Sequence, residues 1–245
     1  MRAALLGVVL GSLLLPVTAA EVCRIPDDLP RPRVPHSKPN PLPVAGYQLV
    51  LSWSPHYCER RAESRAPHAG GGRGRELAVN RASWDDEFQC HDNHFTWVVH
   101  GLWPQAENTT GKDTSPRACR PSDRLPQDIL RANLCTTPSV SLMQHEWSDH
   151  GTCLTDDPRQ YFGAIRKLLQ RFPLAAMQVT PGPTTVGAIR TAIARANPAL
   201  LRPQHIGVRL DGRHLKEAYL CLDLKQAPTA CSGRPPRDDL PVTVD

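Results

Sequence analysis

Two histidine-containing segments carry the residues of this chain that are best suited to acid–base chemistry. The first reads His-Gly-Leu-Trp-Pro-Gln over residues 100–105, and the second reads His-Glu-Trp-Ser-Asp-His-Gly-Thr-Cys over residues 145–153. Imidazole titrates near neutral pH, so one histidine can accept a proton while another donates one. Such a pair suits in-line attack of a ribose 2′-hydroxyl on its own phosphate without a metal ion. That reaction requires RNA, because DNA lacks the 2′-hydroxyl.

The second segment is predicted to lie on a helix over residues 139–150 that ends at Gly151. On a helix with ~100° per residue, the side chains of four ionisable residues share one arc. They are His145, Glu146, Asp149 and His150. A polar arc taken alone is typical of an exposed helix face, because burying several charges is costly.

A histidine at the end of a predicted strand changes this interpretation. Residues 95–99 are predicted to form a strand that leads to His100, and residues 101–104 are predicted to turn sharply. That geometry would present the imidazole in a cleft. Two histidine-bearing segments together favour an active site over a solvated helix face.

Both segments resemble the active-site segments of the ribonuclease T2 family, whose members are secreted acid endoribonucleases. Further similarity lies in Tyr-Gln-Leu-Val-Leu-Ser-Trp-Ser-Pro over residues 47–55, followed by Cys58, and in Glu-Ala-Tyr-Leu-Cys over residues 217–221. The resemblance covers most of the chain, although residues 24–43 and 59–81 match nothing distinctive. It implies an α+β fold with an antiparallel sheet, no cofactor, and cleavage of RNA to 2′,3′-cyclic phosphate ends that are then slowly hydrolysed.

The same resemblance implies a role for each site residue. His100 and His150 correspond to the acid–base pair, and the sequence leaves open which of the two takes the first proton. His145 corresponds to a phosphate contact, and Glu146 to a residue that supports the charged groups. Trp103 corresponds to a residue that packs beside the site and forms a base-binding wall.

The spacing of Glu146 and His150 adds a physical expectation. Residues four apart meet on one helix face, so the carboxylate is predicted to hold the imidazole and favour its charged form. The expected consequence is a raised pKa for His150, which suits a reaction below pH 7.

Asp149 departs from the family, which usually carries a lysine at this position to meet the charge of the pentacovalent phosphorane. An aspartate reverses the sign of that contact, and losing one such contact typically slows a reaction about a hundredfold. The hypothesis is a slowed enzyme in which Asp149 also raises the pKa values of neighbouring histidines. A compensating cation could come from residues 59–81 or from Lys112, but the sequence places neither near the site.

Eight cysteines, an even number, are typical of a disulfide-bonded exported protein. The resemblance implies the pairs Cys58–Cys90, Cys119–Cys153 and Cys221–Cys231, which leaves Cys23 to pair with Cys135. The second of these pairs would anchor the end of the histidine-bearing helix.

The N-terminal residues are typical of a signal peptide. Arg2 precedes an apolar run over residues 3–15, and Pro16 and small residues follow, so residues 1–20 are predicted to be cleaved on export. The apolar run is too short to span a bilayer, and no later run approaches the required length of ~20 residues. The expected location is periplasmic or extracellular.

One α+β domain, stapled by disulfides and with a largely antiparallel sheet packed against helices, is the predicted architecture. The 245 residues, of which 40% are hydrophobic, support a packed core, whereas the net charge of +5 decides little about partners. A Pro-rich arm is predicted over residues 21–45, the ribonuclease domain over 46–234, and a loose tail over 235–245. A basic insertion over 59–81 is predicted to be a surface loop.

Regular elements inside the domain follow from the residue pattern. A strand is expected over residues 47–53, and helices over 158–172 and 184–196. A hairpin over 206–224 is expected to turn at Asp211-Gly212.

The sequence also offers three rival interpretations. The segment His145-Glu146 superficially resembles a zinc-protease helix, but position +4 is Asp149 rather than the required histidine. Cys90 with its neighbours His91 and His94 could suggest a metal site, yet an exported cysteine is expected to be disulfide-bonded. A non-catalytic secreted RNA-binding protein of the same fold remains the alternative function, with position 149 as its sign of decay.

The resulting expectation is a monomer that acts on single-stranded RNA, with no DNA, membrane, metal or cofactor. The glycosylation sequon at Asn108 lies just past residue 105 and matters only in a cell that glycosylates exported proteins. The remaining histidines have no predicted functional role. They are His36, His56, His68, His205 and His214.

Overall fold

The structure, a computed structural model that describes residues 23–65, 83–107, 115–233 and 235–245, is built around strand β1 (Gly46–Trp53). Leu49, Val50 and Leu51 in this strand are fully buried. Because successive side chains of a strand point to opposite faces, protein covers both faces of β1 at this point. The strand predicted over residues 47–53 is confirmed as an interior strand of the sheet, next to the edge strand.

The sheet is almost entirely antiparallel. β1 lies between β2 (Trp97–Gln105) and β5 (His214–Leu222), and β5 also pairs with β4 (Ile206–Asp211). β6 (Pro241–Val244) meets β5 in a parallel pairing and pairs antiparallel with β3 (Gly182–Thr185). The predicted α+β class and the predicted hairpin, now β4 and β5, are both confirmed.

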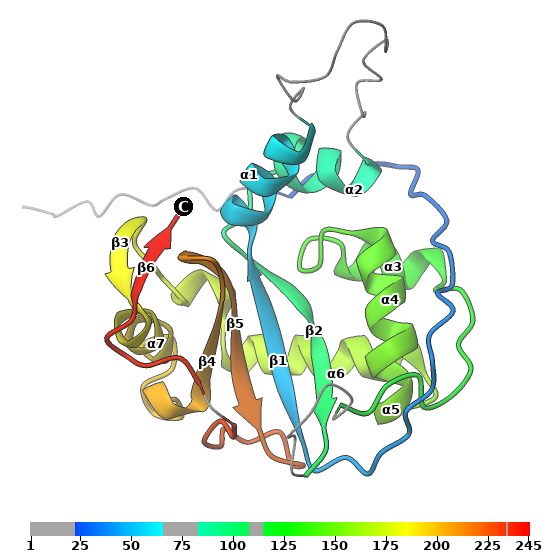
Figure 1. Ribbon diagram of the computed structural model, residues 1–245. Helices are drawn as coiled ribbons and strands as arrows, with labels where there is room; N and C mark the ends of the chain where they lie inside the picture. Colours follow the sequence, from blue (N-terminus) through cyan, green and yellow to red (C-terminus); the bar gives the residue numbers. More distant parts are fainter. Residues whose placement is uncertain (1–22, 66–82, 108–114, 234) are drawn as a thin grey trace, which may run out of the picture.

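Helices surround the sheet, with α4 beside β2 and α7 beside β4 (Figure 1). The α-helices of the described residues are α1 (Ser54–Arg65), α2 (Trp84–Glu87), α3 (Gln127–Asn133), α4 (Val140–Glu146), α5 (Thr152–Leu154), α6 (Pro158–Arg171) and α7 (Val186–Ala194). Two π-helical segments are η1 (Phe88–Asp92) and η2 (Trp147–Gly151), and two 3₁₀ segments are η3 (Leu174–Ala176) and η4 (Pro203–His205).

Helix α6 behaves as its residue pattern predicts. Asp157 caps its first turn by accepting a hydrogen bond from the Arg159 backbone N–H at 2.8 Å. The buried apolar face includes Tyr161, whose hydroxyl accepts a hydrogen bond from the Leu102 backbone N–H at 3.0 Å. This contact fixes β2 close to the first histidine segment.

Four disulfides confirm the three pairs that the family resemblance implies and the fourth pair that was left over. They are Cys23–Cys135, Cys58–Cys90, Cys119–Cys153 and Cys221–Cys231. The first ties the N-terminal arm, which runs along the outside of α3 and α4 (Figure 1), to the domain. The third holds α5, immediately after the histidine-bearing helix.

Two expectations about the histidine segments are wrong. The sharp turn predicted after His100 is absent, because β2 continues in register with β1 as far as Gln105. Pro104 is tolerated there because β2 is an edge strand, where a missing backbone N–H costs little. The helix predicted to stop at Gly151 instead continues through η2 into α5. A Cβ at Gly151 would overlap the ring of Trp147, so the glycine provides space there rather than a helix end.

Two expectations about the surface segments also need correction. Residues 59–65 belong to α1 rather than to a loop, and Arg61 on this helix binds the buried Asp86 at 2.7 Å. The tail predicted to be loose contains β6, in which Val242 and Val244 are buried against the core. Alternating apolar residues explain this, since they provide the buried face of a short strand.

Several expectations fall on residues that the structure does not describe. They concern the signal peptide over 1–20, the insertion beyond residue 65, the sequon at Asn108, and Lys112. Among the described residues, no helix is long and apolar enough to cross a membrane.

Replacing Gly151 by alanine is expected to destabilise the fold. The added Cβ would overlap Trp147 and press on Tyr161, and overpacking of this kind typically costs about 1–3 kcal/mol. Urea denaturation followed by circular dichroism measures the loss. Gly163→Ala is the matched control, because its Cβ would meet only the Arg166 guanidinium at 3.8 Å and a helical alanine is favoured. Equal stability of the two variants would contradict this account of η2.

Candidate active site

His100 occupies an irregular position in strand β2. Val50 pairs with Gly101 and Leu51 pairs with Val99, so His100 is the extra residue of a β-bulge. Bulges re-aim a side chain and increase the local twist. The imidazole is therefore aimed by the irregular pairing of β1 and β2, not by a turn at the end of a strand.

Two carboxylates hold the His100 ring. Glu217 Oε1 on β5 lies 3.0 Å from Nδ1, and Glu146 Oε1 lies 3.4 Å from Nε2. The Ser52 hydroxyl lies 3.1 Å from the same Nδ1 atom. Burial lowers the pKa of His100, but the two carboxylates outweigh burial and raise it from 6.5 to about 9. His100 is therefore positively charged at neutral pH.

Gly101 makes the approach of Glu146 possible. A Cβ at this position would overlap Glu146 Oε2 and crowd the Trp103 indole nitrogen. Glu146 is 2% exposed, and its Oε2 accepts a hydrogen bond from Trp103 Nε1 at 2.6 Å. Its Oε1 atom makes an ion pair with His100 without hydrogen-bond geometry. The glycine and the tryptophan after His100 thus both serve the same carboxylate.

Trp103 separates the two histidines of the expected acid–base pair. The centroid of its ring lies 5.2 Å from that of His100, edge to face, and 5.1 Å from that of His150, in a stacked arrangement. The predicted meeting of His100, His150, Glu146 and Trp103 is observed.

The expected raised pKa of His150 is wrong. Burial lowers the pKa of His150, and this effect outweighs the opposite influence of Glu146 and Asp149. Its Nδ1 atom is buried and has no hydrogen-bond partner in the described structure. A helical wheel places Glu146 beside His150, but it assumes a regular α-helix. The chain becomes π-helical after Glu146, and the Glu146 carboxylate contacts His100 instead.

His145 and Asp149 lie at the outer side of this group. The His145 side chain is 49% exposed, and its ring centroid lies 6.4 Å from that of His150. Asp149 is largely buried, and its Oδ1 atom accepts a hydrogen bond from the hydroxyl of Ser37 in the N-terminal arm. His145 Nδ1 lies 4.0 Å from this oxygen, so the arm, Asp149 and His145 form one contiguous group.

Arg209 on β4 is a cation that the sequence analysis missed. Its guanidinium lies 4.9 Å from the centroid of Trp103 and 4.3 Å from that of Tyr219, and Nη1 lies 3.3 Å from Glu217 Oε2. Gly207 makes room for Tyr219, because a Cβ there would overlap its ring. The signal was present in the predicted hairpin, whose register pairs Arg209 with Glu217.

The site therefore contains a cationic imidazole, a second imidazole kept neutral by burial, and an exposed third. Preorganised charges of this kind can transfer protons and stabilise a negatively charged transition state. Residues 45–231, which include all of these groups except the arm, match the Ribonuclease T2 family.

The chain belongs to the ribonuclease T2 family.

Relatives in this family are found among bacterial proteins. A probable ribonuclease of Haemophilus influenzae is 35% identical over 134 residues, which make up 54% of this chain and 44% of that protein. A ribonuclease of Aeromonas hydrophila is 28% identical over 207 residues, or 80% of each chain. The first match thus spans less than half of the Haemophilus protein.

A solved structure shows the same fold. The RNase-related protein from Calystegia sepium superposes with a TM-score of 0.57 at 16% identity, covering 82% of this chain and 96% of that chain. Strand β6 and most of the N-terminal arm lie outside the residues that match the T2 family, so Ser37 and Asp245 both lie outside that match.

Removing the charge of Glu217 is expected to lower the pKa of His100. Glu217→Gln keeps the size of the side chain but removes an anion 3.0 Å from Nδ1. A titration of the His100 ring followed by NMR measures the change, with Glu63→Gln, whose exposed side chain pairs with Arg60, as the control.

The same shift predicts how stability depends on pH. Because the pKa of folded His100 is raised from 6.5 to about 9, its stabilising effect is complete below pH 6.5 and is lost as the pH rises through about 9. The free energy of unfolding of the wild type should fall over this window more steeply than that of Glu217→Gln. Parallel curves, or an unchanged NMR titration, would refute the assignment of Glu217.

Proposed function

We propose that this chain is an exported endoribonuclease that cleaves single-stranded RNA by metal-independent transphosphorylation. One observation carries the proposal, namely the opposite pKa shifts of two histidines on either side of Trp103. The pKa of His100 is raised to about 9, and burial lowers that of His150. Groups whose pKa values are pushed apart in one site are suited to the roles of acid and base.

The proposed reaction assigns a role to each histidine. Neutral His150 takes the proton of the ribose 2′-hydroxyl, and the 2′-oxygen then forms a bond to phosphorus. The bond from phosphorus to the 5′-oxygen breaks, and protonated His100 gives its proton to that leaving oxygen. The products are a 2′,3′-cyclic phosphate end and a free 5′-hydroxyl, and the cyclic end is hydrolysed in a slower second step.

The surrounding residues would stabilise the transition state. His145 is exposed close to His150 and would contact a phosphoryl oxygen when protonated. Glu146 keeps His100 charged and fixes the Trp103 indole, which would form one wall of the base-binding region. Arg209 beside Trp103 supplies a cation close to this wall, although Glu217 partly neutralises it.

Export, the form of the substrate and the monomeric state also belong to this proposal. The four disulfides favour an oxidising compartment, periplasmic or extracellular, and the sequence of residues 1–20 favours cleavage on export. RNA rather than DNA is required because the 2′-hydroxyl is the nucleophile. A monomer suffices, since all the proposed groups come from one chain.

Digestion of single-stranded RNA in the presence of a chelator tests the proposal. The oxidised wild-type chain should produce 2′,3′-cyclic phosphate ends, with a bell-shaped pH profile whose alkaline limb reflects the pKa of His100 near 9. His100→Ala should lose at least about 100-fold in rate, because general acid catalysis contributes about 10²–10⁴-fold. His91→Asn, at an exposed position, is the control.

Cleavage that His100→Ala retains in full, or that depends on added metal, would contradict the mechanism. Binding of RNA by a folded wild type that never cuts it would favour the non-catalytic RNA-binding protein instead.

Replacing Asp149 by lysine is expected to increase the rate of cleavage. The change replaces an anion near His145 with a cation that can meet the phosphoryl oxygens, and one such contact is typically worth about 100-fold. Initial rates on single-stranded RNA measure the effect. Ser37→Ala is the matched control, because it removes the same hydrogen bond but leaves the charge of Asp149 unchanged. A lysine variant that is folded but no faster would show that Asp149 does not slow the enzyme.

A further inference from the structure

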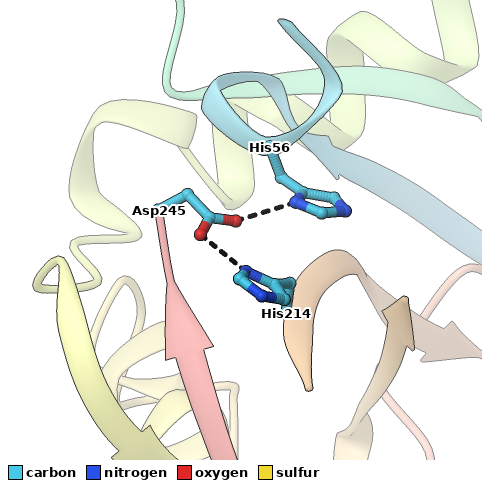
Figure 2. A group of neighbouring side chains, drawn as sticks. All are labelled: His56, His214 and Asp245. Carbon is cyan, nitrogen blue, oxygen red and sulfur yellow. Dashed lines mark hydrogen bonds and ion pairs between the residues drawn. The ribbon is translucent and has the colours of Figure 1, made fainter. Parts of the chain in front are cut away.

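Two histidines without an expected role meet at one carboxylate. His56 Nδ1 lies 2.8 Å from Asp245 Oδ2, and His214 Nδ1 lies 2.7 Å from Asp245 Oδ1. Figure 2 shows both imidazoles directed at this carboxylate. Their rings stack with their centroids 5.3 Å apart. Neither histidine contributes to the ribonuclease site proposed above.

The three residues come from segments far apart in the sequence. His56 lies in the first turn of α1, His214 begins β5, and Asp245 directly follows β6. Trp53 Nε1 donates a hydrogen bond to the Asp245 backbone oxygen at 3.0 Å, which fixes this residue against the end of β1. The cluster is therefore held in place by the backbone and by a buried tryptophan, independently of the histidine contacts.

A second carboxylate completes the surroundings of His56. Its Nε2 atom lies 3.3 Å from Asp211 Oδ2, and Arg60 Nε lies 3.2 Å from the same oxygen. A metal-ligating histidine typically donates its other ring N–H to a carboxylate, which fixes the tautomer and leaves the first nitrogen free to bind. His56 has this arrangement, with Nε2 on Asp211 and Nδ1 facing Asp245.

We propose that His56 Nδ1, His214 Nδ1 and the Asp245 carboxylate bind one Zn²⁺ ion. Two imidazoles and a carboxylate are ligands that Zn²⁺ takes in tetrahedral sites, and three protein ligands leave a fourth position for water. The three ligand atoms lie within 4.8 Å of one another. Zn–N bonds of about 2.0–2.1 Å set tetrahedral ligand atoms about 3.4 Å apart, so a small rotation of one side chain closes the site.

The exposures of the side chains agree with this geometry. The His56 side chain is 6% exposed and is held rigidly, whereas that of His214 is 45% exposed and can rotate. The half-exposed histidine also provides a path for the ion. With Arg60 opposite Asp211, two carboxylates and one guanidinium surround the site, and their net charge of −1 favours a cation there.

The bound ion would connect β6 and its following residue to α1 and β5. Its effect would be on stability, because a ligand that binds only the folded chain shifts unfolding by mass action. The site borders a cavity of about 300 Å³ that is also lined by His100 and Glu217, but none of the three proposed zinc ligands takes part in the proposed RNA cleavage.

Calorimetric titration of the chelator-stripped full chain with zinc chloride tests the proposal. The wild type should bind one equivalent tightly, and its melting temperature should rise in zinc. His214→Asn should lose both effects, and Asp211→Asn should bind about 10- to 100-fold more weakly because the orienting carboxylate is gone. His91→Asn, which alters an exposed histidine outside the cluster, should bind as the wild type does.

Two further variants decide between this cluster and the catalytic histidines. His150→Ala should keep the zinc equivalent, and Asp245→Asn should lose it even if His214→Asn does not fold. Absence of zinc binding by the wild type, or its loss in His150→Ala and not in Asp245→Asn, overturns the proposal. The outcome is independent of RNA cleavage, which is assayed in chelator.

Discussion

The buried carboxylate of Glu146 is the constraint on which the site depends. A charge with 2% exposure is stable only if it is paired, and here the partners are the Trp103 indole N–H and the His100 imidazolium. Bringing these partners to Glu146 constrains the neighbouring backbone in two ways. Gly101 must lack a side chain, and the chain after Glu146 must widen into η2 so that His150 can stack on Trp103. The sequence around both histidines thus reflects the placement of one anion.

A second anion, Glu217, helps to make the pKa values of His100 and His150 shift in opposite directions. It lies on β5, which β1 and β2 separate from helix α4, and it contacts His100, whereas His150 has only burial and more distant charges around it. The same carboxylate holds Arg209 against Trp103 and Tyr219. The sheet therefore supplies one of the two carboxylates that raise the pKa of His100, and helix α4 supplies the other.

The sequence predicts those features that depend on local pattern or on family resemblance. The amphipathic spacing of α6, the β4–β5 hairpin and the disulfide pairs are of this kind, although the hairpin turns at Gly212-Arg213, one residue later than predicted. Features that depend on an irregular backbone were not accessible, because a periodic wheel or strand pattern assumes regular geometry. The bulge at His100 and the π-helical turn after Glu146 changed which carboxylate meets which histidine. The cluster at Asp245 was missed for a different reason, since only the folded chain brings its three segments together.

The hydrogen bond from Ser37 to Asp149 connects the candidate active site with a segment outside the family match. A lysine at position 149 could not accept that bond, so the identity of this residue also determines where the arm can rest. Positions 37 and 149 are therefore expected to be epistatic, each substitution having a different effect in the presence of the other. A lysine at position 149 would therefore change the docking of the arm and the charge of the candidate site at the same time.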